Sequence, residues 1–442
     1  MAELKRTNLS VRRERALLVA VILPESSADP ADPLGELRSL ARTAGAQVVD
    51  EIVARRRSVH PGLYVGSGKA AQIAERAGQN SAETIIFDND LSPAQIRDLE
   101  EVVGRKVLDR SELILDIFAS HARTAESRLQ VELAQLEYTY PRLRHMWSHL
   151  ERLAGGASTA AAAVGGIGTR GPGEKQIETD RRLVQKRVSY LKRRIAAIDK
   201  RKVRQVRARK GTFCICLVGY TNAGKSTLMN RLTDADAVVA DMLFATLETK
   251  TRRWRLGDGR CVLLSDTVGF VRDLPHHLVA SFRATLEEAI WADLLIHVAD
   301  ALHERVQQEI IAVERVLAEL GCADQRRLLL LNKTDKVNDP TVRTVLSQQF
   351  PDALFGSAAT GEGIDELVDA VARRAGGEPV CVTLRANCRN GRLMQYIAQH
   401  ADMRDQSFAD ATAEIEAVMA ADCLDRLRAF GDDVEILCQT GS

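Results

Sequence analysis

The sequence has no cysteine before residue 214, no C-x-x-C pair, and no apolar run of the roughly 18–20 residues that a membrane-spanning helix needs. The eight cysteines therefore suggest neither a zinc site nor a disulfide framework, and we interpret them as reduced residues of a protein core. The N-terminus also lacks the apolar core of a signal peptide. We therefore expect a soluble, cytoplasmic protein with no membrane span.

An excess of charge of either sign is missing as well, since 61 Lys and Arg stand against 60 Asp and Glu. The formal net charge is +1 over 442 residues, so the overall charge implies no partner and only its local distribution can. A chain of this length is expected to form about two to four domains.

The stretch that predicts a function most directly is G-Y-T-N-A-G-K-S-T at residues 219–227. It follows the apolar run 213–218, which predicts a buried strand, and it leads into a helix. This order is typical of a P-loop, whose backbone N–H groups surround a phosphate. Lys225 should reach the β- and γ-phosphates, and Ser226 should ligate Mg²⁺. The predicted nucleotide contacts are Gly219, Tyr220, Thr221, Asn222, Ala223, Gly224, Lys225, Ser226 and Thr227.

A second motif predicts which base is bound. The apolar run 328–331 ends in N-K-T-D, at the carboxyl end of a predicted strand, where open α/β sheets hold ligands. The Asp335 carboxylate can accept hydrogen bonds from guanine N1–H and the exocyclic amine, which adenine cannot match. A site built this way rejects the wrong base by roughly four orders of magnitude. The predicted base contacts are Asn332, Lys333, Thr334, Asp335, Ser357, Ala358 and Ala359.

Between these motifs lies a predicted sensor of the γ-phosphate. A strand at 261–265 runs into D-T-V-G, in which Asp266 lies near Mg²⁺ and the Gly269 N–H faces the γ-phosphate. A Thr-rich stretch upstream predicts the first switch loop. There Thr246 is our candidate for a second Mg²⁺ ligand, with Thr249 and Thr251 as competitors. We expect nucleotide contacts from Phe244, Ala245, Thr246, Leu247, Glu248, Asp266, Thr267, Val268 and Gly269, and catalytic roles for Lys225, Thr246 and Gly269.

The residue after Gly269 bears on the mechanism. GTPases of the Ras type carry a water-orienting Gln there, whereas this chain has Phe270, which cannot align a water. Intrinsic hydrolysis should therefore be slow, with the missing group supplied from elsewhere. Asn222 is either a ligand of K⁺ or a brace for the P-loop, and the sequence leaves both interpretations open.

The N-terminal part predicts a small parallel α/β domain. Strands at 16–23, 46–54, 84–87 and 106–108 alternate with helices at 35–44, 66–79 and 92–103. The sequence G-S-G-K at 66–69 resembles a second P-loop but lacks the required first glycine, so we interpret it as a turn before a helix.

From residue 127 a helical hairpin is predicted. One heptad seam consists of Leu129, Leu133, Leu136, Tyr140, Leu143, Trp147 and Leu150, with a kink expected at Pro141, and a second consists of Val184, Val188, Leu191, Ile195 and Ile198. The segment from Gly155 to Gly173 forms a glycine-rich tip that carries Arg170. Residues 181–210 of the returning helix contain fourteen Lys and Arg against one acid, which favours nucleic acid over a merely solvated face. Without a base-reading module, RNA recognised by shape is more plausible than specific DNA.

The chain resembles the HflX-type GTPases, a ribosome-associated family of the translation-factor-related P-loop class. The residues that carry the resemblance are Y-V-G-S-G-K at 64–69, L-Q-V-E-L-A-Q-L at 129–136, G-G-I-G-T-R-G-P-G-E at 165–174, and the segment 266–287. The resemblance implies that the protein binds the large ribosomal subunit and its rRNA, that the hairpin tip reaches towards the peptidyl-transferase region, and that the protein splits subunits under stress. Family members commonly have D-P after the switch Thr-Leu, whereas Glu248-Thr249 follows here.

We therefore predict an α/β protein: a P-loop GTPase domain at 211–375, preceded by a small parallel α/β domain at 10–125 and an antiparallel helical hairpin at 126–210, with a small α+β domain at 376–442 of order βαββαβ. The expected function is a monomeric GTP- and Mg²⁺-dependent switch that dissociates or rescues ribosomes. Two alternatives are a nucleotide-sensing regulator of a protein partner and an ATP-driven RNA remodeller.

Overall fold

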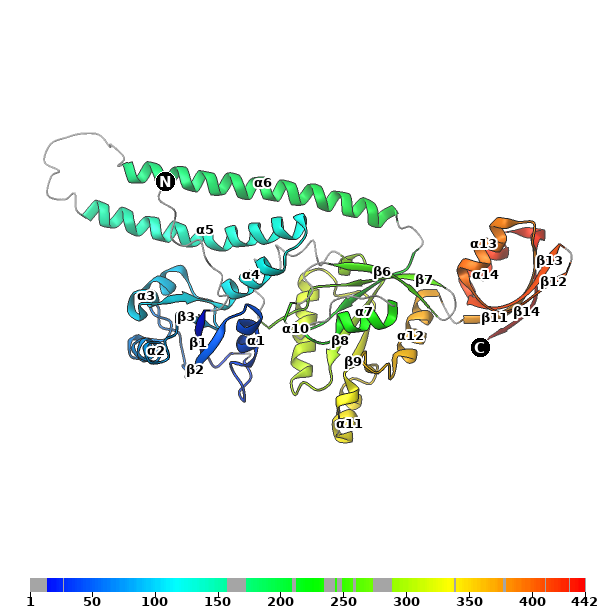
Figure 1. Cartoon of the computed structure of the whole chain (residues 1–442), viewed down its shortest axis with the longest axis horizontal. Helices are drawn as coiled ribbons and strands as arrows, with labels where there is room; N and C mark the ends of the chain where they lie inside the picture. Colours follow the sequence, from blue (N-terminus) through cyan, green and yellow to red (C-terminus); the bar gives the residue numbers. More distant parts are fainter. Residues whose placement is uncertain are drawn as a thin grey trace. The chain divides into compact units, whose positions relative to one another are not determined.

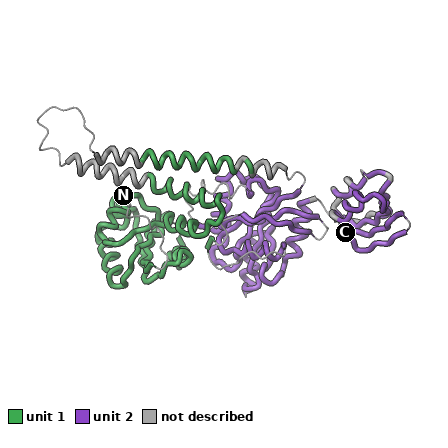
Figure 2. Tube along the Cα trace, turned by 45° about the horizontal axis from the view of Figure 1, so that its top comes forward, with its two compact units in different colours: residues 1–204, 242–248, 272–284 green, residues 205–241, 249–271, 285–442 purple. Residues whose placement is uncertain are grey.

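The structure is a computed structural model. It describes residues 14–26, 28–156, 172–208, 212–233, 243–244, 249–256, 260–272, 288–337, 339–376, 379–409, 411–428 and 430–441. The chain divides into two compact units (Figure 2). Unit 1 comprises residues 1–204, 242–248 and 272–284, and unit 2 comprises residues 205–241, 249–271 and 285–442. The chain therefore leaves unit 2 twice, on each occasion for a short segment of unit 1.

Unit 1 begins with a parallel sheet of order β2-β1-β3-β4. Its elements follow one another along the chain as β1 Arg15–Ile22, α1 Gly35–Thr43, β2 Gln47–Arg55, α2 Ser67–Gln79, β3 Thr84–Phe87, α3 Pro93–Val103, β4 Lys106–Leu108 and α4 Arg110–His121 (Figure 1). The predicted alternation of strands and helices is confirmed. Only Gly66 of G-S-G-K precedes α2, with φ +81°, and Ser67, Gly68 and Lys69 form the first turn of this helix.

Both faces of this sheet are buried, as expected when βαβ crossovers cover a parallel sheet. Leu17, Val19 and Val21 of β1 share a buried cluster with residues of α2 and α3. The intervening Leu18 and Ala20 are also fully buried and point to the opposite face, because successive side chains of a strand alternate.

Helix α4 was not expected from the sequence. Its residues Leu113, Ile114, Leu115, Ile117 and Phe118 are all buried, so the helix is apolar around most of its circumference. Such a helix has no amphipathic period to reveal it. Its start is local nevertheless, because the Asp109 carboxylate caps it by accepting from the Glu112 N–H at 2.9 Å.

The predicted hairpin consists of α5 Ala125–Gly156 and α6 Pro172–Ala208, which lie side by side and antiparallel in Figures 1 and 2. Helix α5 continues through Pro141 without a break. Leu133 and Leu191 of the two seams are buried, while Gln185 and Arg181 donate to the Tyr140 hydroxyl at 2.7 and 3.1 Å. The side chains of Leu143, Trp147 and Leu150, and most of the tip with Arg170, lie outside the described residues.

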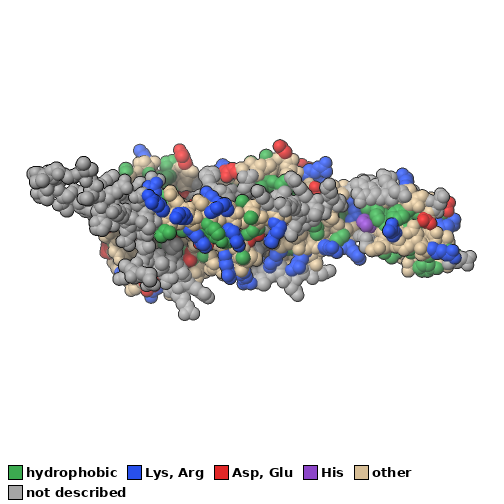
Figure 3. Space-filling view, turned by 90° about the horizontal axis from the view of Figure 1, so that it is seen from above, with side chains coloured by type: hydrophobic (Ala, Val, Ile, Leu, Met, Phe, Trp, Pro, Cys, Tyr) green, Lys and Arg blue, Asp and Glu red, His purple; other side chains and the backbone are tan. Residues whose placement is uncertain are grey.

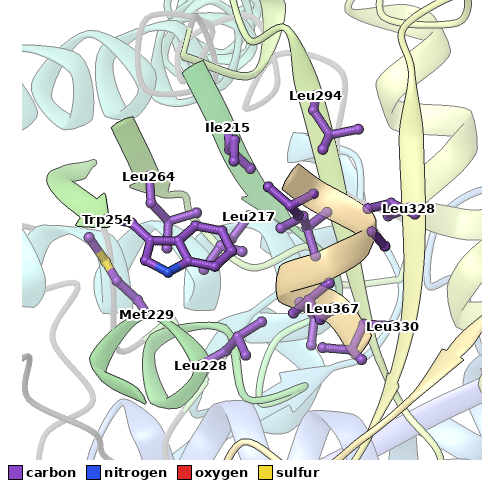
Figure 4. Packing of buried hydrophobic residues seen from close by; sticks show 14 of the residues in the cluster. Ile215, Leu217, Leu228, Met229, Trp254, Leu264, Leu294, Leu328, Leu330 and Leu367 are labelled. Carbon is purple, nitrogen blue, oxygen red and sulfur yellow. The ribbon is translucent and has the colours of Figure 1, made fainter. Parts of the chain in front are cut away.

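Unit 2 contains a six-stranded sheet of order β10-β9-β8-β5-β7-β6, parallel except for β6. Its elements are β5 Cys214–Val218, α7 Lys225–Thr233, β6 Lys250–Arg255, β7 Cys261–Asp266, β8 Leu294–Asp300, α10 Val306–Glu319, β9 Arg327–Asn332, η1 Thr334–Lys336, α11 Pro340–Gln349, β10 Leu354–Phe355 and α12 Ile364–Gly376. Figure 4 shows the core on one face, where Leu228 and Met229 of α7 and Leu367 of α12 pack against strand residues such as Leu217 and Leu264.

The C-terminal part has the predicted βαββαβ order: β11 Pro379–Asn387, α13 Gly391–His400, β12 Ala401–Ala409, β13 Thr412–Ala420, α14 Ala421–Arg428, η2 Gly431–Asp433 and β14 Val434–Gly441. Its strands pair antiparallel in the order β12-β13-β11-β14. The side chains of Val382, Leu384, Leu393 and Ile397 form part of its own core.

The cysteines depart in part from our interpretation. All eight are free, but only Cys216, Cys322 and Cys423 are buried, whereas Cys261 and Cys438 are exposed. The expectation that they are all core residues was wrong, because Cys261 begins β7 and Cys438 lies in β14, each at a position that faces solvent. Among the described helices, none combines the length and apolarity needed to cross a bilayer.

The hairpin seam supplies a test of the packing. Leu191→Ala should lower the free energy of unfolding by about 2–5 kcal/mol, because a fully buried leucine leaves a cavity when it is truncated. Leu183 of the same helix is 58% exposed, and Leu183→Ala is the matched control, with an expected change within about 0.5 kcal/mol. Denaturant unfolding followed by circular dichroism measures both. Equal destabilisation of the two variants would contradict the assigned seam.

Candidate nucleotide site

The P-loop follows β5, which lies between β7 and β8 in the sheet of unit 2. Gly219 has φ +148°, and a Cβ built there would lie 2.1 Å from the Val298 carbonyl oxygen. Gly224 has φ +96°, and its Cβ would lie 2.3 Å from Asn332 Nδ2. Both positions therefore require glycine, for backbone conformation and for space. The loop passes this close to β8 and β9 because its backbone must turn tightly into α7.

Lys225, the first residue of α7, is buried. Its Nζ donates to the carbonyl oxygens of Gly219 at 3.0 Å and Tyr220 at 2.7 Å, so the ammonium lies inside the loop. Burial lowers the pKa of Lys225 to about 8, against an opposing effect of Asp266 and Glu309. A phosphate in the loop would restore the charged form, because a nearby anion favours an ammonium.

The oxygen ligands suited to a divalent cation meet next to this lysine. Ser226 donates its hydroxyl hydrogen to Asp266 Oδ2 at 2.7 Å, at the carboxyl end of β7. A hydroxyl beside a carboxylate is the hard-oxygen combination that Mg²⁺ prefers, so these residues fit the ion. Thr267 is fully buried and donates to the Leu217 carbonyl oxygen at 2.6 Å, which ties the D-T-V-G segment to β5.

Gly269 and Phe270 are held against the P-loop by the backbone. The Phe270 N–H donates to the Gly219 carbonyl oxygen at 3.1 Å, and the Thr221 N–H donates to the Phe270 carbonyl oxygen at 2.8 Å. A Cβ at Gly269 would lie 2.8 Å from Thr221 Cα and 3.0 Å from Lys225 Nζ, so this glycine approaches the lysine closely. The Phe270 side chain is only 2% exposed. Its burial was not apparent from the sequence, and it makes the ring a packing residue.

The base side of the site depends on Asn332, the last residue of β9. Its side chain is 2% exposed, donates to the Ala223 carbonyl oxygen at 2.8 Å, and accepts from the Ala358 N–H at 2.9 Å. One amide thus joins the P-loop to the S-A-A segment. Arg231 of α7 also donates to the carbonyl oxygens of Ala358 and Ala359. No pattern near Arg231 marked it for this contact.

The other residues of the N-K-T-D motif lie around this amide. Lys333 has φ +64°, and its Nζ lies 2.7 Å from Asp300 Oδ2 at the end of β8. Asp335 lies in η1 and is exposed, where its carboxylate is accessible to a base. Ser357 is fully buried, and its hydroxyl accepts from the Thr360 N–H at 3.1 Å, which shapes the turn after β10.

The first switch segment is described only in part. Residues 245–248, and with them Ala245, Thr246, Leu247 and Glu248, lie outside the described residues. Phe244 is buried in unit 1, with its ring centroid 4.6 Å from that of Phe118 in an edge-to-face contact. Any contact of Phe244 with a nucleotide would therefore come from its backbone. Thr251 is no longer a competitor for the metal, because it lies in β6 with its hydroxyl 2.9 Å from that of Ser265.

Arg272, two residues after Phe270, has its side-chain partners in unit 1. Arg272 Nη2 lies 2.7 Å from Asp88 Oδ2, and its N–H donates to Glu36 Oε1 at 3.2 Å. Arg110 pairs with the same two acids, at 2.6 Å from Asp88 and 2.9 Å from Glu36, and donates to the Arg272 carbonyl oxygen at 3.0 Å. Burial raises the pKa of Asp88, and the two arginines oppose this shift. The sequence offered no signal for this four-residue cluster, whose members come from separate parts of the chain.

The pKa of Lys225 generates a prediction. The free protein should lose the ammonium as the pH rises through about 8, so nucleotide affinity should be full below this pH and fall about tenfold per pH unit above it. Titration with a fluorescent guanine nucleotide between about pH 7 and 9 measures the effect, with circular dichroism as a check on folding. Affinity that stays constant over this range would contradict a depressed lysine pKa.

Three family models match the chain: the N-terminal region of GTP-binding GTPases at residues 31–119, their middle region at 121–209, and the 50S ribosome-binding GTPase at 214–333. The GTPase HflX of Escherichia coli K12 is 44% identical over 86% of this chain and 87% of its own length. The GTPase HflX of Lacrimispora saccharolytica is 39% identical over 95% of this chain and 97% of its own.

Among solved structures, a GTP-binding protein from Sulfolobus solfataricus in complex with GDP matches 82% of this chain and 98% of its own, at 23% identity and a TM-score of 0.41. The family models together cover well over half of this chain, and the HflX relatives extend over nearly all of it. The chain therefore belongs to the HflX family of GTPases, and it binds and hydrolyses GTP.

Proposed function

We propose that this GTPase binds the rRNA of the large ribosomal subunit in its GTP form and dissociates or rescues ribosomes under stress. The observation that carries the proposal is the charge on α6. Residues 181–198 contain seven Lys and Arg and no acid, and all seven are exposed. Figure 3 looks onto the side of the molecule on which α6 lies, where Lys and Arg side chains gather and acidic ones are few. Such one-sided charge suits a polyanion, because phosphate neutralisation releases counterions.

The relatives support the choice of polyanion, since residues 214–333 match a model described as a 50S ribosome-binding GTPase. We assign ribosome binding to α6 and to the tip with Arg170. The proposed parts are the α/β domain at 10–125, the hairpin at 126–210, the GTPase domain at 211–375 and the α+β domain at 376–442. The protein would act as a monomer in the cytoplasm, the compartment that contains the ribosomes.

In the nucleotide site, we assign the phosphates to the backbone of residues 219–227 and to Lys225. Mg²⁺ would be held by Ser226 and Thr246, with Asp266 beside it, and when bound it would neutralise charge between the β- and γ-phosphates. The hydroxyl–carboxylate distance of 2.7 Å at Ser226 and Asp266 supports this assignment. Gly269 would offer its N–H to the γ-phosphate. Asn222, exposed with φ +62°, is the proposed K⁺ ligand.

The base would be read by Asp335 and enclosed by the S-A-A segment at 357–359. Asn332 acts through these loops, because its two hydrogen bonds hold the P-loop and Ala358 at a set separation. We therefore regard Asn332 as a positioning residue. Asp335 is the group that distinguishes guanine, since its carboxylate only accepts hydrogen bonds.

Hydrolysis would switch the protein through the two segments that join unit 1. GTP orders the chain around Thr246 and Gly269, and the adjoining residues 242–248 and 272–284 belong to unit 1. Phe244 and Arg272 both have buried partners there, so a rearrangement of either switch would be transmitted to the domain that carries the hairpin. The Arg272 side chain is engaged with Asp88 and Glu36, so we do not assign it the role of orienting the attacking water. The group that orients this water would come from the ribosome.

Two alternatives make different predictions. A regulator of a protein partner would leave ribosomes in the supernatant with either nucleotide. An ATP-driven RNA remodeller would hydrolyse ATP in competition with GTP.

Asp335→Asn tests the base assignment. The variant should bind GTP at least about 100-fold more weakly and lose most of its preference for GTP over ATP, because an amide replaces an acceptor by a donor. Lys336→Asn is a control at the neighbouring exposed position and should leave the preference unchanged. Competition of GTP and ATP against a fluorescent guanine nucleotide measures both. Undiminished preference in Asp335→Asn would contradict the proposed base site.

Ribosome binding is tested by sedimentation of large subunits with protein in a non-hydrolysable GTP analogue or in GDP. The protein should pellet mainly with the analogue. Neutralising Lys186, Arg193 and Arg194 should reduce the salt slope of binding by about 2–3, at roughly 0.7–0.9 per lost contact. Neutralising the exposed Arg315, Lys336 and Arg373 is the matched control and should leave the slope unchanged. Pelleting that is independent of nucleotide and of these α6 cations would refute the proposal.

The same subunits should accelerate hydrolysis, since Phe270 offers no water-orienting group. GTPases completed in trans gain roughly 10³–10⁵ in rate, an upper guide for the effect here. Phe270→Leu, which keeps the buried side chain apolar, should retain the slow basal rate, whereas Lys225→Ala should abolish both rates. Turnover of several per second by ribosome-free protein without K⁺ would show that the chain itself positions the water.

A further inference from the structure

The outward face of α6 carries an aromatic side chain that packs against no core. Tyr190 is 41% exposed, although its neighbour Leu191 is fully buried in the seam with α5. Adjacent helical residues point about 100° apart, so Tyr190 faces away from the seam. Leu183, seven residues earlier on the same stripe, is 58% exposed. The helix thus presents two large apolar side chains where a solvated face would have polar ones.

Cations surround the Tyr190 ring. The guanidinium carbon of Arg187 lies 5.4 Å from the ring centroid and that of Arg194 lies 5.9 Å from it. These residues are three before and four after Tyr190, so they share its face of the helix. Arg187 is held from its other side by Glu132, with Nε 2.6 Å from Oε1 and Nη2 2.8 Å from Oε2. The ring therefore lies between two guanidinium groups, and the ion pair with Glu132 fixes the position of one of them, that of Arg187.

We propose that Tyr190 is a stacking platform for an unpaired RNA base, with Lys186, Arg193 and Arg194 contacting the flanking phosphates. The inference rests on the proposed rRNA binding and specifies its chemistry. A base in a duplex is stacked on its neighbours and offers a helix only phosphates and sugars, whereas an unpaired base exposes a π-face. The combination of basic side chains with an accessible aromatic ring is what single-stranded nucleic acid requires.

The other interpretations use only part of this arrangement. An acidic protein would engage the cations but not the ring face. A cation–π contact within the helix contributes little at an exposed site and leaves Leu183 unexplained. Unpaired RNA uses the charge, the ring and the pre-ordered Arg187 together, because an ordered side chain loses less entropy on binding.

The experiment compares the full-length protein with Tyr190→Leu, Tyr190→Phe and Lys186→Ala. The probes are a labelled single-stranded RNA of about 12 nucleotides and a blunt duplex of the same length, in line with the short sites of single-strand binders. Tyr190→Leu should weaken single-strand binding about 5- to 150-fold with an unchanged salt slope, while duplex binding stays constant. Tyr190→Phe should bind as the wild type does, and Lys186→Ala should lower the slope by about 0.7.

Single-strand affinity of Tyr190→Leu equal to that of the wild type would overturn the stacking role, as would an equal loss on the duplex. Leucine retains helix propensity and apolar bulk, so a fall in affinity with unchanged circular dichroism reports the lost π-face. Failure of the wild type to pellet with ribosomes would instead contradict the proposed function. Normal pelleting together with an unaffected Tyr190→Leu variant would contradict this inference alone.

Discussion

The buried side-chain amide of Asn332 is the interaction on which the nucleotide site depends. It donates to the carbonyl oxygen of Ala223 in the P-loop and accepts from the N–H of Ala358, so the phosphate and base loops share one support. Gly224 has no room for a side chain because this amide lies against it. A buried amide left without partners would be costly, so the two loops and the end of β9 are mutually constrained. The core shown in Figure 4 packs α7 and α12 against the strands that lead into these loops.

Phe244 and Arg272, which lie beside the proposed switch segments, both have their partners in unit 1. Phe244 packs against Phe118, and Arg272 joins a buried cluster with Asp88, Glu36 and Arg110. Each acid of this cluster pairs with both arginines, so no member depends on a single partner. A segment that changes between two packed arrangements can act as a switch, whereas a segment without fixed contacts cannot transmit a conformational change.

Different faces of helix α6 serve packing and the proposed RNA binding. The seam that includes Leu191 packs against α5, and a face about 100° further around the helix carries Tyr190 among arginines. Ion pairs from Arg187 to Glu132 and from Lys192 to Glu137 connect the two helices beside the seam. Being largely exposed, these pairs contribute little stability. All seven cations at 181–198 are exposed. This surplus of charge is the physical basis for assigning the helix to a polyanion.

The sequence alone determined those features whose physics is local. The P-loop, N-K-T-D and D-T-V-G are each a strand end followed by a turn, and the heptad seams predicted both long helices. The spacing did not identify every buried position. Leu133 and Leu191 are buried, but the seam residues Leu129, Leu136, Val184 and Val188 are only partly buried, whereas Gln130, Val131 and Ala134 of α5 are buried outside the seam. The sequence also specified the strand and helix order of the N-terminal sheet. Helix α4 was missed, since a helix buried on all sides has no period.

Only the tertiary structure decided which distant residues meet. Asn332 lies 109 positions from Ala223, and Arg272 lies 184 from Asp88, so no window of sequence contains either pair. It also decided that Phe270 is a packing residue, that Thr251 is engaged with Ser265, and that Cys261 and Cys438 face solvent. These outcomes follow from strand order and from the competition of many side chains for the same buried space, which local propensity does not encode.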